Sequence, residues 1–270
     1  MGSRRSAGRR AGRSAARTQA RGERRSPPPL EGGGDLAFTS TPVLAPGASP
    51  PPAHPAVRGH HPGSAPGTPA ERAAAAAGQA RSLDDLRAAL AAFDGCALRD
   101  TATNLVFAVG DPDASLMLIG DPPGDAEDRS GTPFAGPDGG LLDHMLGSVG
   151  LARDAMLLTP LIPWRPPGGR LPSAAEIAVC LPFLHRLIAL VAPHRVVLAG
   201  ALAARTLLGP TRRRATPAWT ELPLPALAAP VPALVMPSPA LIARTPGSRR
   251  EAWAALRLLR RTLDADLAKS

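Results

Sequence analysis

Four short apolar runs, separated by segments in which apolar residues have helical spacing, constrain the fold more than any other feature of this sequence. The runs lie at residues 116–119, 156–159, 195–200 and 233–236. Runs of this length are typical of buried strands, and strands that alternate with helices form a parallel sheet covered on both faces. The sequence therefore predicts an α/β fold: a three-layer α/β/α domain with a central parallel sheet of about four strands. Residues 105–109 are a possible edge strand.

Helices are predicted between and after these runs. Ser173 and Glu176 form a capping-box pattern that opens a long helix, and Ser248 with Glu251 repeats the pattern before a C-terminal helix. Pro182 lies inside the long helix and is expected to kink it or to mark its true beginning. The apolar positions with helical spacing are Leu83, Leu86 and Leu90; Leu141, Leu142, Met145 and Val149; Ile177, Leu181, Leu184, Ile188 and Val191; and Trp253, Leu256, Leu259 and Leu263.

Residues 1–80 differ in composition from the rest of the chain, being first Arg-rich and then rich in Pro, Gly and Ala. Such a segment buries too little apolar surface to offset the entropy lost on ordering, so we predict a disordered arm followed by a domain at 81–270. The arm carries nearly all of the net charge of +9. It either binds polyanions through counterion release or serves as solubilising chain. A start codon assigned too far upstream is a further explanation.

Only two cysteines occur, Cys96 and Cys180, which fits a reducing, cytoplasmic location. No apolar stretch follows the basic N-terminus, so no secretory signal is expected. The most apolar region, 187–208, is interrupted by Pro193, His194 and Arg195. It is therefore not expected to span a bilayer, which takes about 20 consecutive apolar residues.

The segment after the first apolar run is the strongest candidate for a site. Residues 120–129 hold glycines, prolines and several carboxylates, and Phe134 follows beside small residues. Open α/β sheets bind ligands at the carboxyl ends of their strands, and an aromatic face among polar groups suits a flat ligand such as a nucleobase. The alternative is an ordinary solvated strand–helix connection. A phosphate-binding turn is disfavoured because carboxylates repel an anion.

Several motifs, taken in order, give the chain a family resemblance. From about Ser82 to Leu263 it resembles the family 4 uracil-DNA glycosylases. The motifs are Gly-Asp-Pro-Pro-Gly at 120–124, Pro-Phe-Ala-Gly at 133–136, Leu-Leu-Asp-His-Met-Leu at 141–146, Trp-Arg-Pro-Pro-Gly-Gly-Arg at 164–170, Cys-Leu-Pro-Phe-Leu at 180–184, Arg-Thr-Pro at 244–246 and Arg-Arg-Glu-Ala-Trp at 249–253.

The resemblance implies hydrolysis of the bond between uracil and deoxyribose after the base leaves the stack. Phe134 would stack on the everted uracil, and an acidic residue, Asp121, would orient water or stabilise positive charge on the sugar. The implied residues fall into three sets: catalytic Asp121, Asp125 and Ser238; base-binding Gly120, Gly124, Phe134 and Thr159; and DNA-binding Arg165, Leu241 and Arg244. A basic run, Arg212–Arg214, either contacts phosphates or is a solvated turn.

Two polar side chains of the family are absent. Ser238 stands where the family has a histidine, and Pro160 stands where an asparagine after Thr159 is expected. Serine can donate a hydrogen bond but cannot become cationic, and proline has no side-chain donor or acceptor. Loss of one preorganised donor typically costs about 2.7–4 kcal/mol in the barrier. Asp121 replaces a glutamate, which keeps the carboxylate but sets it one methylene back.

The family also carries a 4Fe-4S cluster on four cysteines. Phe93 occupies the first position of the expected Cys-x-x-Cys pair ending at Cys96, and Cys180 matches a third ligand. A complete Cys₄ site cannot form in one chain with two cysteines, so we predict no cluster and expect apolar packing around Phe93. His144, His185 and His194 are expected to be structural because no partner residue shares a motif with them.

Two functions remain open from the sequence. The first is a uracil-DNA glycosylase-like enzyme of base excision repair, acting on single- or double-stranded DNA as a monomer with reduced or altered activity. The second is a catalytically inactive relative that binds DNA or a partner.

Overall fold

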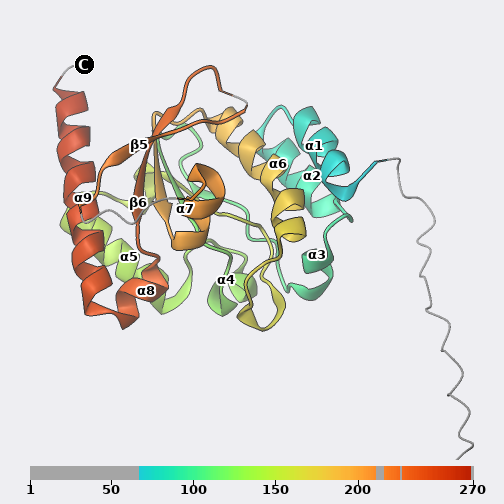
Figure 1. Ribbon diagram of the computed structural model, residues 1–270, viewed down its shortest axis with the longest axis horizontal. Helices are drawn as coiled ribbons and strands as arrows, with labels where there is room; N and C mark the ends of the chain where they lie inside the picture. The colour runs from blue at the N-terminus through green and yellow to red at the C-terminus, as the bar shows by residue number, and fades with distance from the viewer. Residues whose placement is uncertain (1–66, 211–215, 226, 269–270) are drawn as a thin grey trace, which may run out of the picture. The chain divides into compact units, whose positions relative to one another are not determined.

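A computed structural model of the protein describes residues 67–210, 216–225 and 227–268. Its centre is a six-stranded sheet with the order β1-β3-β2-β4-β6-β5 (Figure 1). The strands are β1 (Val109–Gly110), β2 (Leu116–Gly120), β3 (Leu157–Pro160), β4 (Arg195–Ala199), β5 (Trp219–Leu222) and β6 (Val231–Met236). The arm at 1–66 and the basic run Arg212–Arg214 lie outside the described residues.

The four central strands, β3, β2, β4 and β6, are parallel, as predicted. The prediction of about four strands was incomplete, because antiparallel strands close both edges. The possible edge strand at 105–109 is only the short β1, which pairs with β3. Strand β5 was not predicted, since it is half exposed and lacks an apolar run.

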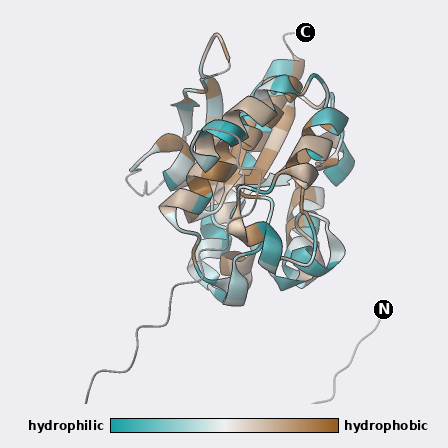
Figure 2. Cartoon of the chain, turned by 90° about the vertical axis from the view of Figure 1, so that its right-hand side faces the viewer, coloured by the Kyte–Doolittle hydropathy of each residue, from teal (hydrophilic) through white to brown (hydrophobic). Residues whose placement is uncertain are grey.

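Helices cover both faces of the sheet. The first face is covered by α1 (Pro69–Gln79), α2 (Leu83–Ala92), α6 (Ala174–Val191) and α7 (Ala201–Leu208). The opposite face is covered by α5 (Gly136–Ser148), α8 (Pro239–Arg244) and α9 (Pro246–Leu267). The short helices α3 (Ala97–Thr101) and α4 (Asp125–Ser130) and the 3₁₀ turns Arg153–Ala155 and Pro167–Gly169 lie in the connections. Figure 2 shows hydrophobic strands between helices whose outer surfaces are more hydrophilic. This is the predicted three-layer arrangement.

Helix α1 falls within residues expected to be disordered, so the predicted start of order near residue 82 was too late. Thr68 and Glu71 form a complete capping box at its beginning. Ala73 and Ala77 are buried where the helix packs on α6. Small alanine side chains allow the two helices to approach closely, but in the sequence they do not stand out from the Ala-rich arm.

Helix α6 begins after Ser173, whose side chain completes the predicted capping box with Glu176. The helix continues through Pro182, so that residue does not mark its beginning. By length and composition, α6 is the one helix in the described part of the chain that could cross a membrane. It packs against α1 and α2 and contributes Phe183, Leu187 and Ile188 to the core, as the central helix of a folded domain does.

Candidate functional site

The carboxyl ends of the four parallel strands form one row of residues. Gly120 pairs with Pro160 on one side and with Ala199 on the other, and Ala199 pairs with Met236. Asp121 follows Gly120 directly and Ser238 lies two residues after Met236, so both lie at the same edge of the sheet. Because neighbouring strands are about 4.8 Å apart, Gly120 and Met236 are separated by about 10 Å.

Phe134 reaches this row from the turn before α5. Its side chain is buried and belongs to the core cluster on the α5 face of the sheet. The ring covers Gly120 so closely that a Cβ on Gly120 would lie 2.6 Å from the ring atom Cζ. Gly120 and Phe134, both predicted to bind a base, therefore lie in contact. Phe134 also has a φ of 54°, in the left-handed region that a bulky residue seldom adopts.

Two charged side chains hold the Phe134 turn. Glu127, on α4, accepts a hydrogen bond from the Phe134 backbone N–H at 2.6 Å. Arg153 donates to the carbonyl oxygens of Pro133 and Phe134 at 3.1 and 2.9 Å, and to Asp143 at 2.9 Å. The sequence analysis did not identify Glu127 or Arg153. The Gly124-x-x-Glu127 spacing of a capping box was a signal, but glycine at the first position hides it.

The carboxylate of Glu127 also accepts a hydrogen bond from the Gly124 backbone N–H at 2.6 Å. Burial raises the pKa of Glu127 above its ordinary value, and the two backbone N–H groups oppose this rise. Gly124 stays a predicted base-binding residue, and its backbone N–H is bound to this carboxylate.

Asp121 caps helix α7, which lies far from it in the sequence. Its Oδ1 accepts hydrogen bonds from the N–H groups of Leu202 and Ala203 in the first turn of α7, at 3.0 and 2.9 Å. Gly200 precedes α7 with a φ of 153°, and a Cβ there would lie 2.2 Å from Cγ of Asp121. Burial raises the pKa of Asp121, while the helix N–H groups lower it. Asp121 therefore stabilises the start of α7 in addition to any catalytic role.

Asp125, at the first turn of α4, is paired with two arginines. It contacts Arg165 at 3.1 Å and also Arg129. The buried Nε of Arg165 is the one buried side-chain nitrogen or oxygen among the described residues without a hydrogen-bond partner. Asp125 is therefore paired with two arginine side chains at the start of α4.

Ser238 precedes α8, and its side chain makes no capping hydrogen bond. Its backbone carbonyl accepts hydrogen bonds from the N–H groups of Leu241 and Ile242 at 3.0 Å. Leu241 is 43% exposed, which is unusual for a leucine in this protein, and Arg244 is exposed at the end of the same helix. The residues predicted to contact DNA on this helix thus face solvent at the edge where Ser238 lies.

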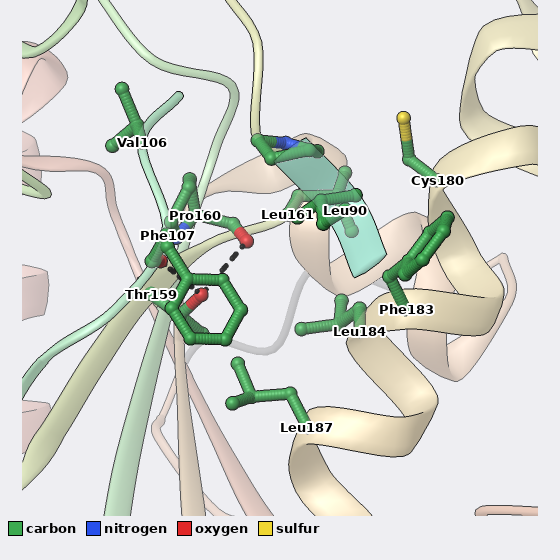
Figure 3. A pocket seen from close by; sticks show the side chains of 11 residues that line it. Leu90, Val106, Phe107, Thr159, Pro160, Leu161, Cys180, Phe183, Leu184 and Leu187 are labelled. Atoms are coloured by element: carbon green, nitrogen blue, oxygen red, sulfur yellow. Dashed lines mark hydrogen bonds between the residues drawn. The ribbon is translucent and has the colours of Figure 1, made fainter. Parts of the chain in front are cut away.

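Thr159 is turned away from this group. Its hydroxyl donates to the Phe107 carbonyl at 2.9 Å, and it lines a mostly apolar pocket between α2, α6 and the end of β3 (Figure 3). That pocket lies on the sheet face opposite Phe134. The structure gives no support to the predicted contact between the Thr159 side chain and a base.

The two cysteines lie together but do not make a cluster site. Their sulfur atoms are 4.0 Å apart and buried. Phe93, at the position of the family's first ligand, packs edge-on against Phe183 with ring centroids 5.3 Å apart. Among the described residues, no group of three or more His, Cys, Asp or Glu side chains could hold a metal ion. The side chains present therefore do not fit a four-cysteine cluster.

Comparison with known proteins identifies relatives of this chain. A family model described as the uracil DNA glycosylase superfamily matches residues 107–257. The type-4 uracil-DNA glycosylase of Pyrobaculum aerophilum is 34% identical over 122 residues, which are 45% of this chain and 62% of the relative. That of Archaeoglobus fulgidus is 37% identical over 124 residues, 46% of this chain and 62% of the relative. That of Thermotoga maritima is 35% identical over 108 residues, 40% of this chain and 56% of the relative. The chain thus spans less than two thirds of these relatives.

Proposed function

Because the chain belongs to the uracil DNA glycosylase superfamily, we propose that it hydrolyses the N-glycosidic bond of uracil in DNA, at a rate reduced by its altered pocket. One observation carries the proposal: the ring of Phe134 lies over Gly120 at the carboxyl edge of the sheet, and Asp121 is the residue that follows Gly120. An aromatic ring and a carboxylate carried by this edge, where α/β sheets bind ligands, suit an everted pyrimidine and its sugar.

Each group at the edge has a part in the proposed reaction. The everted uracil stacks on Phe134, and the Asp121 carboxylate orients a water molecule or stabilises positive charge on the deoxyribose. The bond between C1′ and the base breaks, and the water oxygen bonds to C1′. The uracil leaves as an anion and takes up the proton that the attacking water loses, and the Ser238 hydroxyl donates a hydrogen bond to its oxygen. This donor is weaker than a cationic one.

DNA is the proposed partner, bound by a monomer in the cytoplasm. The exposed Leu241 would enter the stack as the base leaves, and Arg244 would contact backbone phosphates. Arg165 is paired with Asp125 and would add a further phosphate contact. Phosphate contacts position a protein without reading sequence, so strand sequence should matter little.

A second candidate function is binding of DNA without cleavage. It is favoured by a specific observation: Pro160 has no side-chain donor, Ser238 has one that cannot become cationic, and Oδ1 of Asp121 is already hydrogen-bonded to α7. Losing donors that act only in the transition state lowers the rate while leaving duplex contacts in place.

An incubation with uracil-containing oligonucleotides separates the two candidates. The purified protein is mixed with single- and double-stranded DNA, and abasic sites are measured by alkaline strand cleavage. Cleavage that falls at least about 100-fold in Phe134→Ala and Asp121→Asn, but persists in Glu71→Gln on the remote α1, supports the enzyme. Absent cleavage with salt-sensitive binding supports the second candidate, because salt dependence reports phosphate contacts. Absence of both rejects the two together.

A further inference from the structure

One carboxylate joins the two loops at the candidate site. The Oε2 atom of Glu127 accepts a hydrogen bond from the Gly124 N–H, and Oε1 accepts one from the Phe134 N–H, both at 2.6 Å. Gly124 ends the turn that follows β2, and Phe134 carries the ring that covers Gly120. The two oxygens of Glu127 therefore set the distance between the turn and the ring.

The Phe134 backbone needs such a support. A φ of 54° is unfavourable for a residue with a bulky side chain, and it persists only where surrounding contacts enforce it. Glu127 binds the N–H of Phe134, and Arg153 binds its carbonyl from the opposite side at 2.9 Å. Gly139 packs against the same carbonyl, since a Cβ there would lie 1.7 Å from the oxygen. Both polar ends of the Phe134 peptide units are thus held.

The chemistry of the bridge requires a carboxylate. Both partners are N–H donors, so both terminal atoms of the bridging side chain must accept. A glutamine has only one accepting terminal atom, and its NH₂ group would face a donor. Charged acceptors also make shorter and stronger hydrogen bonds than neutral ones.

We propose that Glu127 is the positioning residue for base stacking: it holds Phe134 at the place where the ring meets an everted base. The inference rests on the proposed function for its catalytic consequence but not for its geometry. Both carboxylate oxygens of Glu127 are hydrogen-bonded to backbone N–H groups of the two loops, so it acts through Phe134. A misplacement of about 1 Å in a binding group can lower a rate by about 100-fold.

The chain offers a matched control. Glu71 occupies the same capping-box position of α1 and accepts a hydrogen bond from the Thr68 N–H at 2.7 Å. It touches neither loop of the site. Glu127→Gln and Glu71→Gln therefore make the same change at the same position of a helix cap, and only the first one disturbs Phe134.

Two measurements on the full chain test the inference. The first is amide hydrogen exchange of Gly124 and Phe134 by NMR in the wild type, Glu127→Gln, Glu127→Ala and Glu71→Gln. We expect at least one of the two amides to exchange about 10-fold faster in Glu127→Gln, both in Glu127→Ala, and neither in Glu71→Gln. The isosteric Gln variant keeps the test valid where the Ala variant fails to fold. Wild-type exchange rates in both Glu127 variants would overturn the inference.

The second measurement is single-turnover uracil release together with DNA affinity. We expect Glu127→Gln to lower the rate about 10- to 100-fold while the DNA dissociation constant stays within about 2-fold. Added to Phe134→Ala, the same substitution should have almost no further effect, because the ring through which it acts is gone. An equal rate loss in both backgrounds would refute action through Phe134. A wild type that releases no uracil refutes the proposed function, and hydrogen exchange then decides alone whether Glu127 holds Phe134.

Discussion

The ring of Phe134 occupies the space that any side chain at Gly120 would need, since a Cβ on Gly120 would lie 2.6 Å from Cζ of the ring. Gly120→Ala must therefore push the ring away from the edge of the sheet. We expect uracil release to fall about 100-fold, because the stacking surface is displaced, and stability to fall by about 1–3 kcal/mol from overpacking. Cleavage assays and thermal unfolding measure the two effects.

Gly140→Ala is the matched control for that substitution. Gly140 lies in α5, and a Cβ there meets no atom within 4 Å. Alanine in a helix is more stable than glycine by about 0.5–1 kcal/mol, so this variant should keep activity and unfold at the same or a higher temperature. Equal activity in the two variants would mean that the contact between Gly120 and Phe134 does not matter for the reaction.

Two substitutions of Asp121 distinguish its structural role as the cap of α7 from its proposed chemical role. Asp121→Ala removes the acceptor of the Leu202 and Ala203 N–H groups, and we expect a loss of about 1 kcal/mol of stability. Asp121→Asn keeps an accepting oxygen and should lose less stability, although it loses the charge needed near the sugar. Denaturant unfolding of both variants measures this. If Asp121→Ala unfolds like the wild type, the cap contributes nothing.

Much of the fold could be predicted because its central strands consist of continuous apolar runs. The parallel strands β2, β3, β4 and β6 are almost wholly buried, and buried strands need continuous apolar sequence. The edge strands β1 and β5 are short or half exposed and carry no such pattern. Helix α1 was missed because its buried residues are alanines within an Ala-rich arm.

The candidate site was predictable where its residues are adjacent in sequence and not where contacts join distant segments. The 120–124 turn and Phe134 were found from local pattern and resemblance. Glu127 and Arg153 were missed because they bind backbone atoms, and backbone partners leave no trace in residue types. The side of the sheet that the Thr159 side chain faces could not be predicted, because alternate residues of a strand face opposite sides and the sequence did not fix which side is which.

Acid should reveal the pairing of Glu176 with Arg170. The Arg170 guanidinium donates to both oxygens of Glu176 and, with Ser173, lowers the pKa of this carboxyl from 4.5 to about 2. A carboxyl whose pKa is lower in the folded state than in the unfolded state stabilises the fold at pH values above its unfolded-state pKa. This stability is lost as the pH falls through its folded-state pKa. Between pH 5 and 2, Glu176→Gln should therefore lose less stability than the wild type.

Denaturant midpoints measured at steps from pH 7 to pH 2.5 check this expectation. Glu221→Gln, in the exposed part of β5, is the control and should follow the wild type. The pairing would be without effect on stability if Glu176→Gln and the wild type lost the same free energy of unfolding over this range.

Ser238→His tests whether the altered edge limits the proposed reaction. Ser238 has ordinary extended backbone angles, its hydroxyl does not cap α8, and it follows the strand next to the one paired with Gly120, so a larger side chain can be placed there without loss of a cap. A histidine can donate a hydrogen bond as a cation, and one such donor is typically worth about 100- to 1,000-fold in rate. Because the surrounding groups are not adjusted to it, we expect a smaller gain, about 10-fold or more, in single-turnover uracil release.

Ser148→His is the control: it adds the same side chain to the exposed end of α5 and should give no gain. If the wild type binds DNA without cleaving it and Ser238→His cleaves, the missing cationic donor is what separates this chain from an efficient glycosylase. If Ser238→His and Ser148→His both behave like the wild type, the loss of rate has its cause elsewhere at the edge. Pro160 is then the next position to change.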